Sequence, residues 1–235
     1  MNSGDKQEFR KNVFYINVHR DFWIEVARNL AERIHWAPCY WVSPSKKNIE
    51  NIKKYFPNVI AHEEILAIRG LEPKEMAGIT FPVIDEKLHN EYSDIHLKSI
   101  SMMDMLDPED EFSLYERNKL FYRQFKYWLG VVETFQPDIV VFSKTPHKIY
   151  DFILYSICKR KNIRTVLFEI TALGRLFIRE DYESDFPVYD KYKELLKKYN
   201  ENEFTFHIDD DLQDELSRLQ RDYKEGMPYF MEKYF

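Results

Sequence analysis

Two continuous apolar runs, PDIVVF and RTVLFE, flank a helix-like segment between Pro137 and Glu169. Continuous apolar runs, rather than an alternation of apolar and polar residues, are typical of strands that are covered on both faces. A polar cluster follows the first run directly, and the helix-like segment then leads to the second. This stretch therefore predicts a βαβ unit with polar side chains at the carboxyl end of its first strand.

The amino-terminal part of the chain shows the same succession of apolar strands and amphipathic helices. Asp21 stands where it could cap the first of these helices, and Ser45 could cap the second. Strand, helix, strand, helix and strand in turn favour a parallel sheet with right-handed crossovers. The predicted strands are Asn12–Val18, Ala37–Val42 and Val59–Ala61, and the predicted buried stripes are Phe22, Val26, Leu30 and Ile34 in the first helix and Ile49, Ile52 and Phe56 in the second.

The segment from Ile65 to Asp110 has no clear period and is interrupted by Gly and Pro. It predicts short elements, with Thr80–Ile84 as a candidate strand, and either shapes a substrate pocket or is an ordinary elaborated surface. Apolar periodicity then predicts three further helices. These are Glu111–Phe135, Val188–Tyr199 and Asp210–Gly226.

These elements together predict an α/β protein with a Rossmann-like three-layer sandwich and a mainly parallel sheet. We expect residues 1–180 to form this α/β domain. Residues 181–235 predict a helical carboxyl-terminal extension, which packs on that domain or on a partner domain.

The composition excludes several classes of protein. A net charge of -6 and a pI near 5.7 argue against a nucleic-acid-binding protein with a broad basic surface. Cys39 and Cys158 are far apart and have no CxxC spacing, so neither a disulfide scaffold nor a cysteine zinc site is expected. The first residues lack the apolar core of a signal peptide, and no apolar run approaches the ~20 residues that span a bilayer. The sequence predicts a soluble, cytoplasmic protein.

Common cofactor and metal motifs are absent from the sequence. None of the six glycines stands in a GxGxxG or GxxxxGK[ST] spacing, which argues against a dinucleotide or P-loop site, and there is no GxSxG elbow. His62-Glu63-Glu64 begins like a zinc-protease helix, but Leu66 stands where the second histidine is required. The run Asp209–Asp211 contains an Asp-x-Asp pattern, yet Asp210 followed by Gln213 fits a helix cap better. No cofactor and no metal are expected.

Two polar loops follow predicted strands that should be neighbours. In a doubly wound sheet, the first strand and the first strand of the second half lie side by side where the strand order reverses, and ligands bind there. The convergent side chains could supply a general base and bind phosphate or sugar hydroxyls, although loop or capping roles are the simpler alternative for either histidine. The first loop supplies His19 and Asp21 as catalytic candidates and Arg20 for binding; the second supplies His147 as a catalytic candidate and Ser143, Lys144 and Thr145 for binding.

His147 stands where a helix should begin, and its neutral imidazole could accept a proton from an acceptor hydroxyl. Glu169, Thr171 and Arg175 follow the last strong strand and could form another wall of the crevice. The alternative for Glu169 is an ion pair with a neighbouring Arg or Lys. Glu63 and Glu64, after the third strand, are weaker candidates.

The order of elements from NVFYINVHRDFW through PDIVVFSKTPHKIYDFILYSICKRKNIRTVLFE resembles the amino-terminal half of bacterial capsule and surface-polysaccharide glycosyltransferases of the GT-B type. The resemblance spans roughly Asn12 to Arg179. It implies two facing Rossmann-like domains, of which the first holds a sugar or phosphosugar acceptor and the second a nucleotide-sugar donor. It also implies that His19, Asp21, Lys144 and His147 lie in acceptor-side loops, one of them as base or acceptor clamp.

The residues after Arg179 are too few for a second α/β domain, so we expect either an acceptor-side half or a relative without the usual donor site. A different class of function stays open: a non-catalytic Rossmann-like module that binds carbohydrate or a partner protein. The aromatic tail PYFMEKYF supports that alternative if it docks on another domain, and not if it packs on its own core. Among partners, we expect no nucleic acid, and peripheral membrane association stays an alternative.

Overall fold

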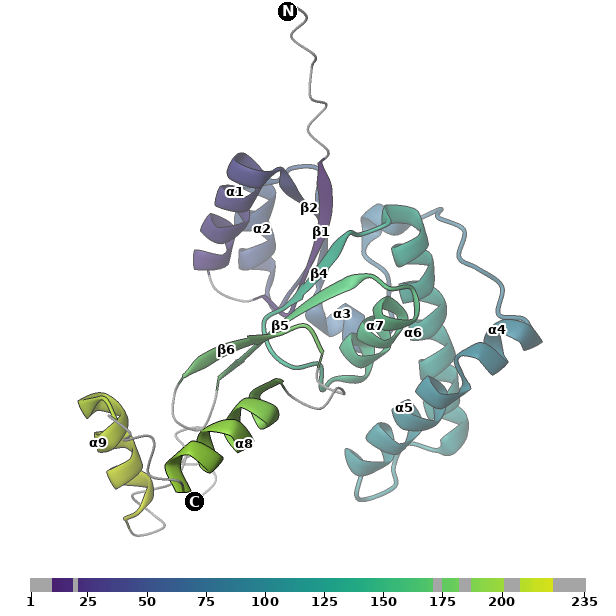
Figure 1. Ribbon diagram of the computed structural model, residues 1–235. Coiled ribbons are helices and arrows are strands. Elements are labelled where there is room, and N and C mark those ends of the chain that lie inside the picture. Colours follow the sequence, from purple (N-terminus) through teal and green to yellow (C-terminus); the bar gives the residue numbers. More distant parts are fainter. Residues whose placement is uncertain (1–9, 19–20, 171–174, 182–186, 201–207, 222–235) are drawn as a thin grey trace, which may run out of the picture. The chain divides into compact units, whose positions relative to one another are not determined.

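The computed structural model describes residues 10–18, 21–170, 175–181, 187–200 and 208–221. Its strands form one six-stranded sheet in the order β3-β2-β1-β4-β5-β6 (Figure 1). The pairs β3–β2, β2–β1, β1–β4 and β4–β5 are all parallel, which confirms the predicted α/β class and mainly parallel sheet. The strands are β1 (Lys11–Ile16), β2 (Trp36–Ser43), β3 (Ile60–Glu63), β4 (Ile139–Phe142), β5 (Arg164–Ile170) and β6 (Leu176–Arg179).

The contacts between residues divide the chain into two units, Met1–Leu167 and Phe168–Phe235. In the first unit, α1 and α2 cover one face of the sheet, and α3, α6 and α7 cover the other (Figure 1). This arrangement makes the three layers of a Rossmann-like sandwich. The helices of the first unit are α1 (Phe22–Ile34), α2 (Lys46–Tyr55), α3 (Glu64–Ile68), α4 (Glu86–Glu91), α5 (Ser93–Met105), α6 (Leu114–Phe135) and α7 (Ile149–Arg160), with a 3-10 turn at Lys74–Met76.

The second unit contains β6 and two helices, α8 (Pro187–Asn200) and α9 (Asp210–Leu219). Asp209 rather than Asp210 is the residue that precedes the α9 helix, and its side chain makes no capping hydrogen bond. The predicted cap at Asp210 is therefore wrong by one position. Asp210 and Asp211 lie instead in the first turn of α9, where the helix dipole stabilises carboxylates.

The helix ends of the first unit follow from local sequence. Ser45 accepts a hydrogen bond from the Asn48 amide at 3.3 Å, which confirms it as the cap of α2. Ser113 and Glu116 form a reciprocal capping box at the start of α6. Gln136 ends α6 with a left-handed φ of 43°, and the chain then enters β4.

The core lies on both faces of the central strands. All four residues of β4 are buried, as are Phe14 and Ile16 in β1. On the α6 face, Trp128 packs edge-on to Tyr40, with ring centroids 5.6 Å apart. Continuous burial of neighbouring residues along a strand explains why these strands read as unbroken apolar runs.

A chain of hydrogen bonds crosses this core from α6 to the segment after α3. The Tyr127 hydroxyl lies 2.5 Å from that of Tyr40, which lies 2.7 Å from His62 Nδ1. His62 Nε2 lies 2.9 Å from the carbonyl oxygen of Leu71. A carbonyl can only accept, so Nε2 carries the hydrogen, Tyr40 donates to Nδ1 and Tyr127 donates to Tyr40.

Two expectations about elements are wrong. Thr80–Ile84 is not a strand but an extended connection between the 3-10 turn and α4. In α1, the buried residues are Trp23, Ile24 and Ala27, whereas Phe22 and Ile34 are about half exposed. The helix therefore buries a face rotated by about one residue from the predicted stripe, because Trp23 offers more apolar area than Phe22.

Candidate functional site

The strand order of the sheet reverses between β1 and β4. The chain moves outward from β1 to β3 and then returns to the other side of β1 with β4. In open α/β sheets, ligands bind outside the carboxyl ends of the strands at this point. Ile16 at the end of β1 is in register with Phe142 at the end of β4, so the segments that follow these strands start side by side.

Hydrogen bonds join these two segments. The Ser143 amide donates to the carbonyl oxygen of Ile16 at 3.1 Å, and the Ser143 hydroxyl donates to the carbonyl oxygen of Asn17. Asn17 has a left-handed φ of 61°, a conformation that asparagine tolerates better than most residues. The chain can therefore turn sharply after β1 while its carbonyl oxygens face the loop after β4.

His147 is exposed in the loop between β4 and α7. Its Nδ1 lies 2.9 Å from the carbonyl oxygen of Thr145. Because the carbonyl can only accept, Nδ1 carries the hydrogen of the neutral ring, and Nε2 presents a lone pair. Nε2 has no hydrogen-bond partner among the described residues. An exposed imidazole nitrogen that carries a lone pair can accept a proton from a bound hydroxyl.

Lys148 is the residue directly before α7, and Lys144 stands four residues earlier in the same loop. Lys148 Nζ lies 2.6 Å from Glu64 Oε1, and both side chains are largely buried. Lys144 is half-buried and makes no hydrogen bond or ion pair with any residue that the structure describes. A cation without a carboxylate near a helix amino terminus can bind an anion such as phosphate.

A buried polar cluster connects the ends of β1 and β4 with the start of α7. Asn17 Nδ2 donates to Asp151 Oδ2 at 2.6 Å, and the Tyr150 hydroxyl donates to Asn17 Oδ1. The same hydroxyl lies 3.2 Å from Glu64 Oε1. The segments that follow β1, β3 and β4 are thus connected through side chains, and a change in one of them affects the other two.

Asp151 is the most unusual ionisable group in this cluster. Its side chain is fully buried, and burial raises its pKa from 3.8 to about 7, against the Lys148 backbone amide, the hydrogen bond from Asn17 and the charge of Lys148. Within the described part of the chain, Asp151 Oδ1 has no hydrogen-bond partner. Burial, followed by the negative charges of Asp151 and Glu64, also raises the pKa of Tyr150 well above its ordinary value. The Tyr150 hydroxyl therefore stays protonated and acts as a donor.

The remaining predicted site residues belong to other parts of the chain. His19, Arg20 and Thr171 lie outside the described residues. Asp21 is exposed and stands at the start of α1 without making the predicted side-chain cap. Glu169 pairs with Arg179 at 2.8 Å, as its alternative reading expected, and Arg175 pairs with Asp211 at 2.6 Å.

No protein-family model, curated protein or solved structure matches this chain. Any assignment of function therefore depends on the chemistry of the residues at the reversal point. The sequence offered no direct signal for Asn17, Lys148, Tyr150 or Asp151. Only an indirect signal was present: Asn17 and Asp151 are polar residues within otherwise apolar runs, as expected of polar side chains that are buried.

A pocket of about 410 Å³ lies at the opposite, amino-terminal ends of the strands. It does not coincide with the predicted site. The hydrogen-bonded polar and ionisable side chains described above lie instead at the carboxyl ends of the strands. Its lining residues come from the ends of α1 and α2 and the starts of β2 and β3, and include Arg10, His35, Pro38, Tyr55, Phe56 and Asn58.

Within the described ranges, no group of three or more His, Cys, Asp or Glu side chains is placed to hold a metal ion. No described helix is both long enough and apolar enough to cross a membrane.

Proposed function

We propose that this chain is a glycosyltransferase-like domain of surface or capsular polysaccharide biosynthesis that acts in the cytoplasm. It binds a sugar or phosphosugar acceptor at the carboxyl ends of β1 and β4. The observation that supports this proposal most strongly is the contact of His147 Nδ1 with the Thr145 carbonyl oxygen, since the exposed ring then offers Nε2 to a ligand.

In this proposal, His147 Nε2 takes the proton from an acceptor hydroxyl. The hydroxyl oxygen then attacks the anomeric carbon of a donor sugar, and the bond from that carbon to the nucleotide diphosphate breaks. Lys144 holds a phosphate of the acceptor or of the leaving group beside the amino end of α7. A second domain or a partner protein supplies the nucleotide-sugar site.

Ligand binding and transfer test this proposal separately. Thermal unfolding is measured with phosphosugars, nucleotide sugars and free nucleotides, since a ligand at about 100 times its Kd adds ~2.7 kcal/mol of stability. We expect stabilisation by a phosphosugar that is lost in Lys144→Ala and kept in Lys87→Ala, a lysine exposed on α4. The absence of a shift with any phosphosugar contradicts the proposed binding.

Transfer to the acceptor that binds best is then measured with a radiolabelled nucleotide sugar and the partner that supplies the donor site. We expect His147→Ala to lower turnover by ~10²-fold or more, the usual loss with a missing general base, while the phosphosugar still stabilises the protein. Near-normal turnover in His147→Ala excludes the role of base, whatever the outcome of the binding experiment.

The alternative function, a non-catalytic carbohydrate-binding module, is favoured by the amino-terminal pocket. Tyr55, which is half exposed, lines this pocket together with the polar residues Arg10 and Asn58. Aromatic rings flanked by polar side chains are suited to bind sugar rings. A sugar whose stabilising effect is lost in Tyr55→Ala but not in Lys144→Ala supports this alternative over the transferase.

A further inference from the structure

The connection between α5 and α6 exposes large apolar side chains at one end of this helix pair. Met105 is 79% exposed and Leu106 67%, at the end of α5. Leu114 is 61% exposed and Tyr115 74%, at the start of α6. We call this surface, formed by Met105, Leu106, Leu114 and Tyr115, the α5–α6 tip. Single exposed apolar residues are common, but several at one turn are characteristic of an interaction surface.

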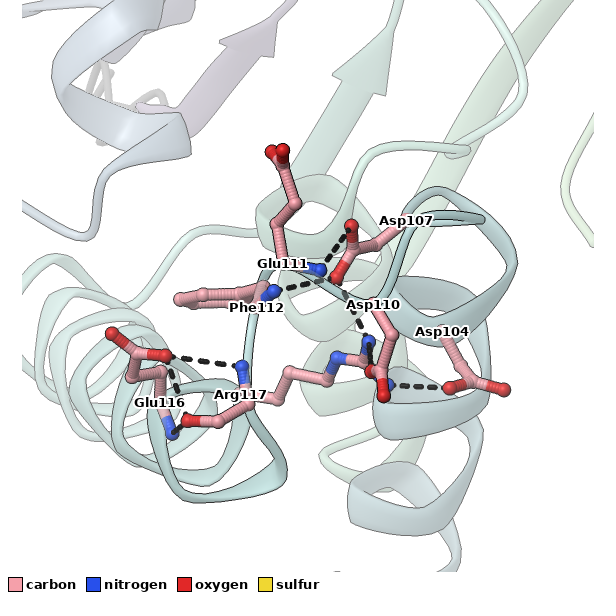
Figure 2. A network of polar contacts seen from close by, with 8 residues as sticks. Asp104, Asp107, Asp110, Glu111, Phe112, Glu116 and Arg117 are labelled. Carbon is pink, nitrogen blue, oxygen red and sulfur yellow. Dashed lines mark hydrogen bonds and ion pairs between the residues drawn. The ribbon is translucent and has the colours of Figure 1, made fainter.

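The α5–α6 tip belongs to an ordered loop. Arg117, whose side chain is only 5% exposed, pairs with Asp104, with Asp107 at 2.9 Å and with Asp110 at 3.0 Å (Figure 2). These aspartates come from the end of α5 and from the loop, whereas Arg117 belongs to α6. The guanidinium therefore connects both helix ends and the segment between them.

Backbone groups of the loop are held as well. Asp107 accepts hydrogen bonds from the amides of Glu111 at 3.1 Å and Phe112 at 2.8 Å (Figure 2). The Phe112 amide, followed by Arg117 and then the Glu111 amide, lowers the pKa of Asp107, and the bonds from Ser113 lower the pKa of Glu116. Both carboxylates are therefore charged near neutral pH. The loop holds the apolar side chains in a defined arrangement, so a partner would lose little loop entropy on binding.

The charge around the α5–α6 tip is strongly negative. Between Met103 and Arg117, the sequence has six carboxylates and no Lys or Arg. Arg117 supplies one cation against them, and the side chains of Asp104 and Asp110 are still 71% and 85% exposed. An apolar surface with an acidic border is complementary to a partner with apolar and basic side chains.

We propose that the α5–α6 tip binds a basic, amphipathic segment of another protein. The charge argues against the other occupants. A second copy of this chain would bring two acidic borders together, and an anionic membrane surface would repel the same carboxylates. A segment with lysines beside an apolar stripe satisfies both features of the surface.

Fluorescence anisotropy tests this proposal with a labelled peptide that has Leu at i, i+3, i+4 and i+7 and Lys at the other positions. A peptide of the same length with Glu in place of Lys should not bind. We expect the double variant Met105→Ser/Tyr115→Ser to weaken binding of the Lys peptide by about tenfold or more, the effect of losing ~1.4 kcal/mol. The variant Glu109→Gln/Glu111→Gln should weaken binding and also reduce its dependence on salt.

Matched variants outside the tip provide the controls. Val83 is 83% exposed elsewhere, and Val83→Ser should leave the affinity unchanged. Glu32→Gln/Glu50→Gln removes the same number of charges from α1 and α2 and should have no comparable effect. Because all these side chains are exposed, circular dichroism should show the same helix content in every variant.

Three results would overturn the proposal. Equal weakening in the tip variants and the controls would mean that the peptide responds only to the net charge of the protein. Concentration-dependent self-association that Met105→Ser/Tyr115→Ser abolishes would assign the surface to a second copy. Binding to vesicles of phosphatidylcholine and phosphatidylserine that the same variant abolishes would assign it to a membrane.

Discussion

The side chain of His62 is fully buried, and both of its ring nitrogens have hydrogen-bond partners, the Tyr40 hydroxyl and the Leu71 carbonyl oxygen. Burial lowers its pKa from 6.5 to about 4, against the hydrogen bond to Leu71. The folded protein therefore resists protonation of this ring at a pH where the unfolded chain accepts the proton. The consequence is a loss of stability as the pH falls from 6.5 toward 4, the range between the two pKa values.

We predict that His62→Gln removes this part of the acid sensitivity. The variant is less stable at pH 7.5, because the Tyr40 hydroxyl and the Leu71 carbonyl oxygen lose their well-aligned hydrogen bonds to the imidazole. The stability difference between wild type and variant should shrink by about 2 kcal/mol between pH 7.5 and pH 5. Urea unfolding at both pH values measures this difference. A constant difference contradicts the prediction, and His147→Gln, at an exposed histidine, serves as the control.

Asp151 titrates in the opposite sense. Its pKa of about 7 in the folded protein lies above its ordinary value of 3.8, so folding favours the protonated acid. The resulting stability is fully present below pH 3.8 and is lost as the pH rises through 7. We predict that wild type loses about 3 kcal/mol from this group between pH 5 and pH 8, whereas Asp151→Asn does not.

Chemical unfolding of wild type and Asp151→Asn at pH 5 and pH 8 checks this prediction. Asparagine is nearly isosteric with the protonated acid and keeps an oxygen for Asn17 Nδ2. Asp21→Asn, at an exposed aspartate, should follow the wild-type profile. Parallel pH profiles for wild type and Asp151→Asn would show that the buried acid ionises as readily in the folded protein as in the unfolded chain.

At the level of helices and loops, Gly130 allows α6 to pack closely against the segment that contains Phe81 and Pro82. It lies within α6, and a Cβ at this position would come within 3.1 Å of Pro82 Cδ and closer still to the ring of Phe81. Alanine favours a helix over glycine by ~1 kcal/mol, but overpacking of this kind costs ~1–3 kcal/mol. We predict that Gly130→Ala destabilises the protein by about 1 kcal/mol in urea unfolding.

The same substitution in a Phe81→Ala background separates the two effects. With the ring removed, the intrinsic helix preference should prevail, and Gly130→Ala should then be neutral or stabilising. A stabilising effect of Gly130→Ala in the wild-type background would mean that the segment around Phe81 moves away without loss.

The elements that the sequence predicted best are those with strong local signals. The buried strands β1, β2 and β4 appear as unbroken apolar runs, and Ser45 caps α2 as expected. The helix α5 was missed, because Ser99 is buried on its inner face and Leu97 is exposed on its outer face, which blurs the apolar period. Thr80–Ile84 has the composition of a strand, but no neighbouring strand pairs with it in the described sheet.

The site was predictable only in position. Strand alternation indicated that the loop from Ser143 to His147 lies beside the end of β1, because topology alone determines this. The support beneath the loop depends on Glu64 reaching Lys148 and Tyr150 across more than eighty residues of sequence. Such pairings arise from the packing of α3 against α7, and no periodicity in one segment contains them.

Across the whole molecule, the two units differ in how many apolar side chains are buried among the described residues. The fully buried apolar side chains described in the structure all precede Phe168, and α9 has no buried residue. Local opening of a helix is easy when few apolar contacts hold it. We predict that amides of α9 exchange with deuterium at least ~100-fold faster than those in the middle of α7, where Tyr150–Cys158 are buried.

Hydrogen-exchange mass spectrometry of the whole chain at neutral pH measures this difference. Peptides from α6 should be protected like those from α7, because the two helices pack on each other and their rings Trp128 and Tyr155 contact Tyr40 and Phe142 of the sheet. Equal protection of α9 and α7 would show that α9 is held by a contact other than apolar burial.

The hydrogen-bonded chain from Tyr127 through Tyr40 to His62 also checks the assembly of the sheet. β3 is a four-residue edge strand, and so short a strand could pair with β2 in several alignments. In the observed alignment His62 stands opposite Val42 and on the same face as Tyr40. A shift by one residue would turn His62 to the other face and leave the buried Tyr40 hydroxyl without its acceptor. The misaligned sheet would therefore be destabilised, in addition to losing the contacts of the correct alignment. With an apolar residue at position 62, no buried hydrogen bond would distinguish the correct alignment of β3 from a shifted one, even if the substitution made the native protein more stable.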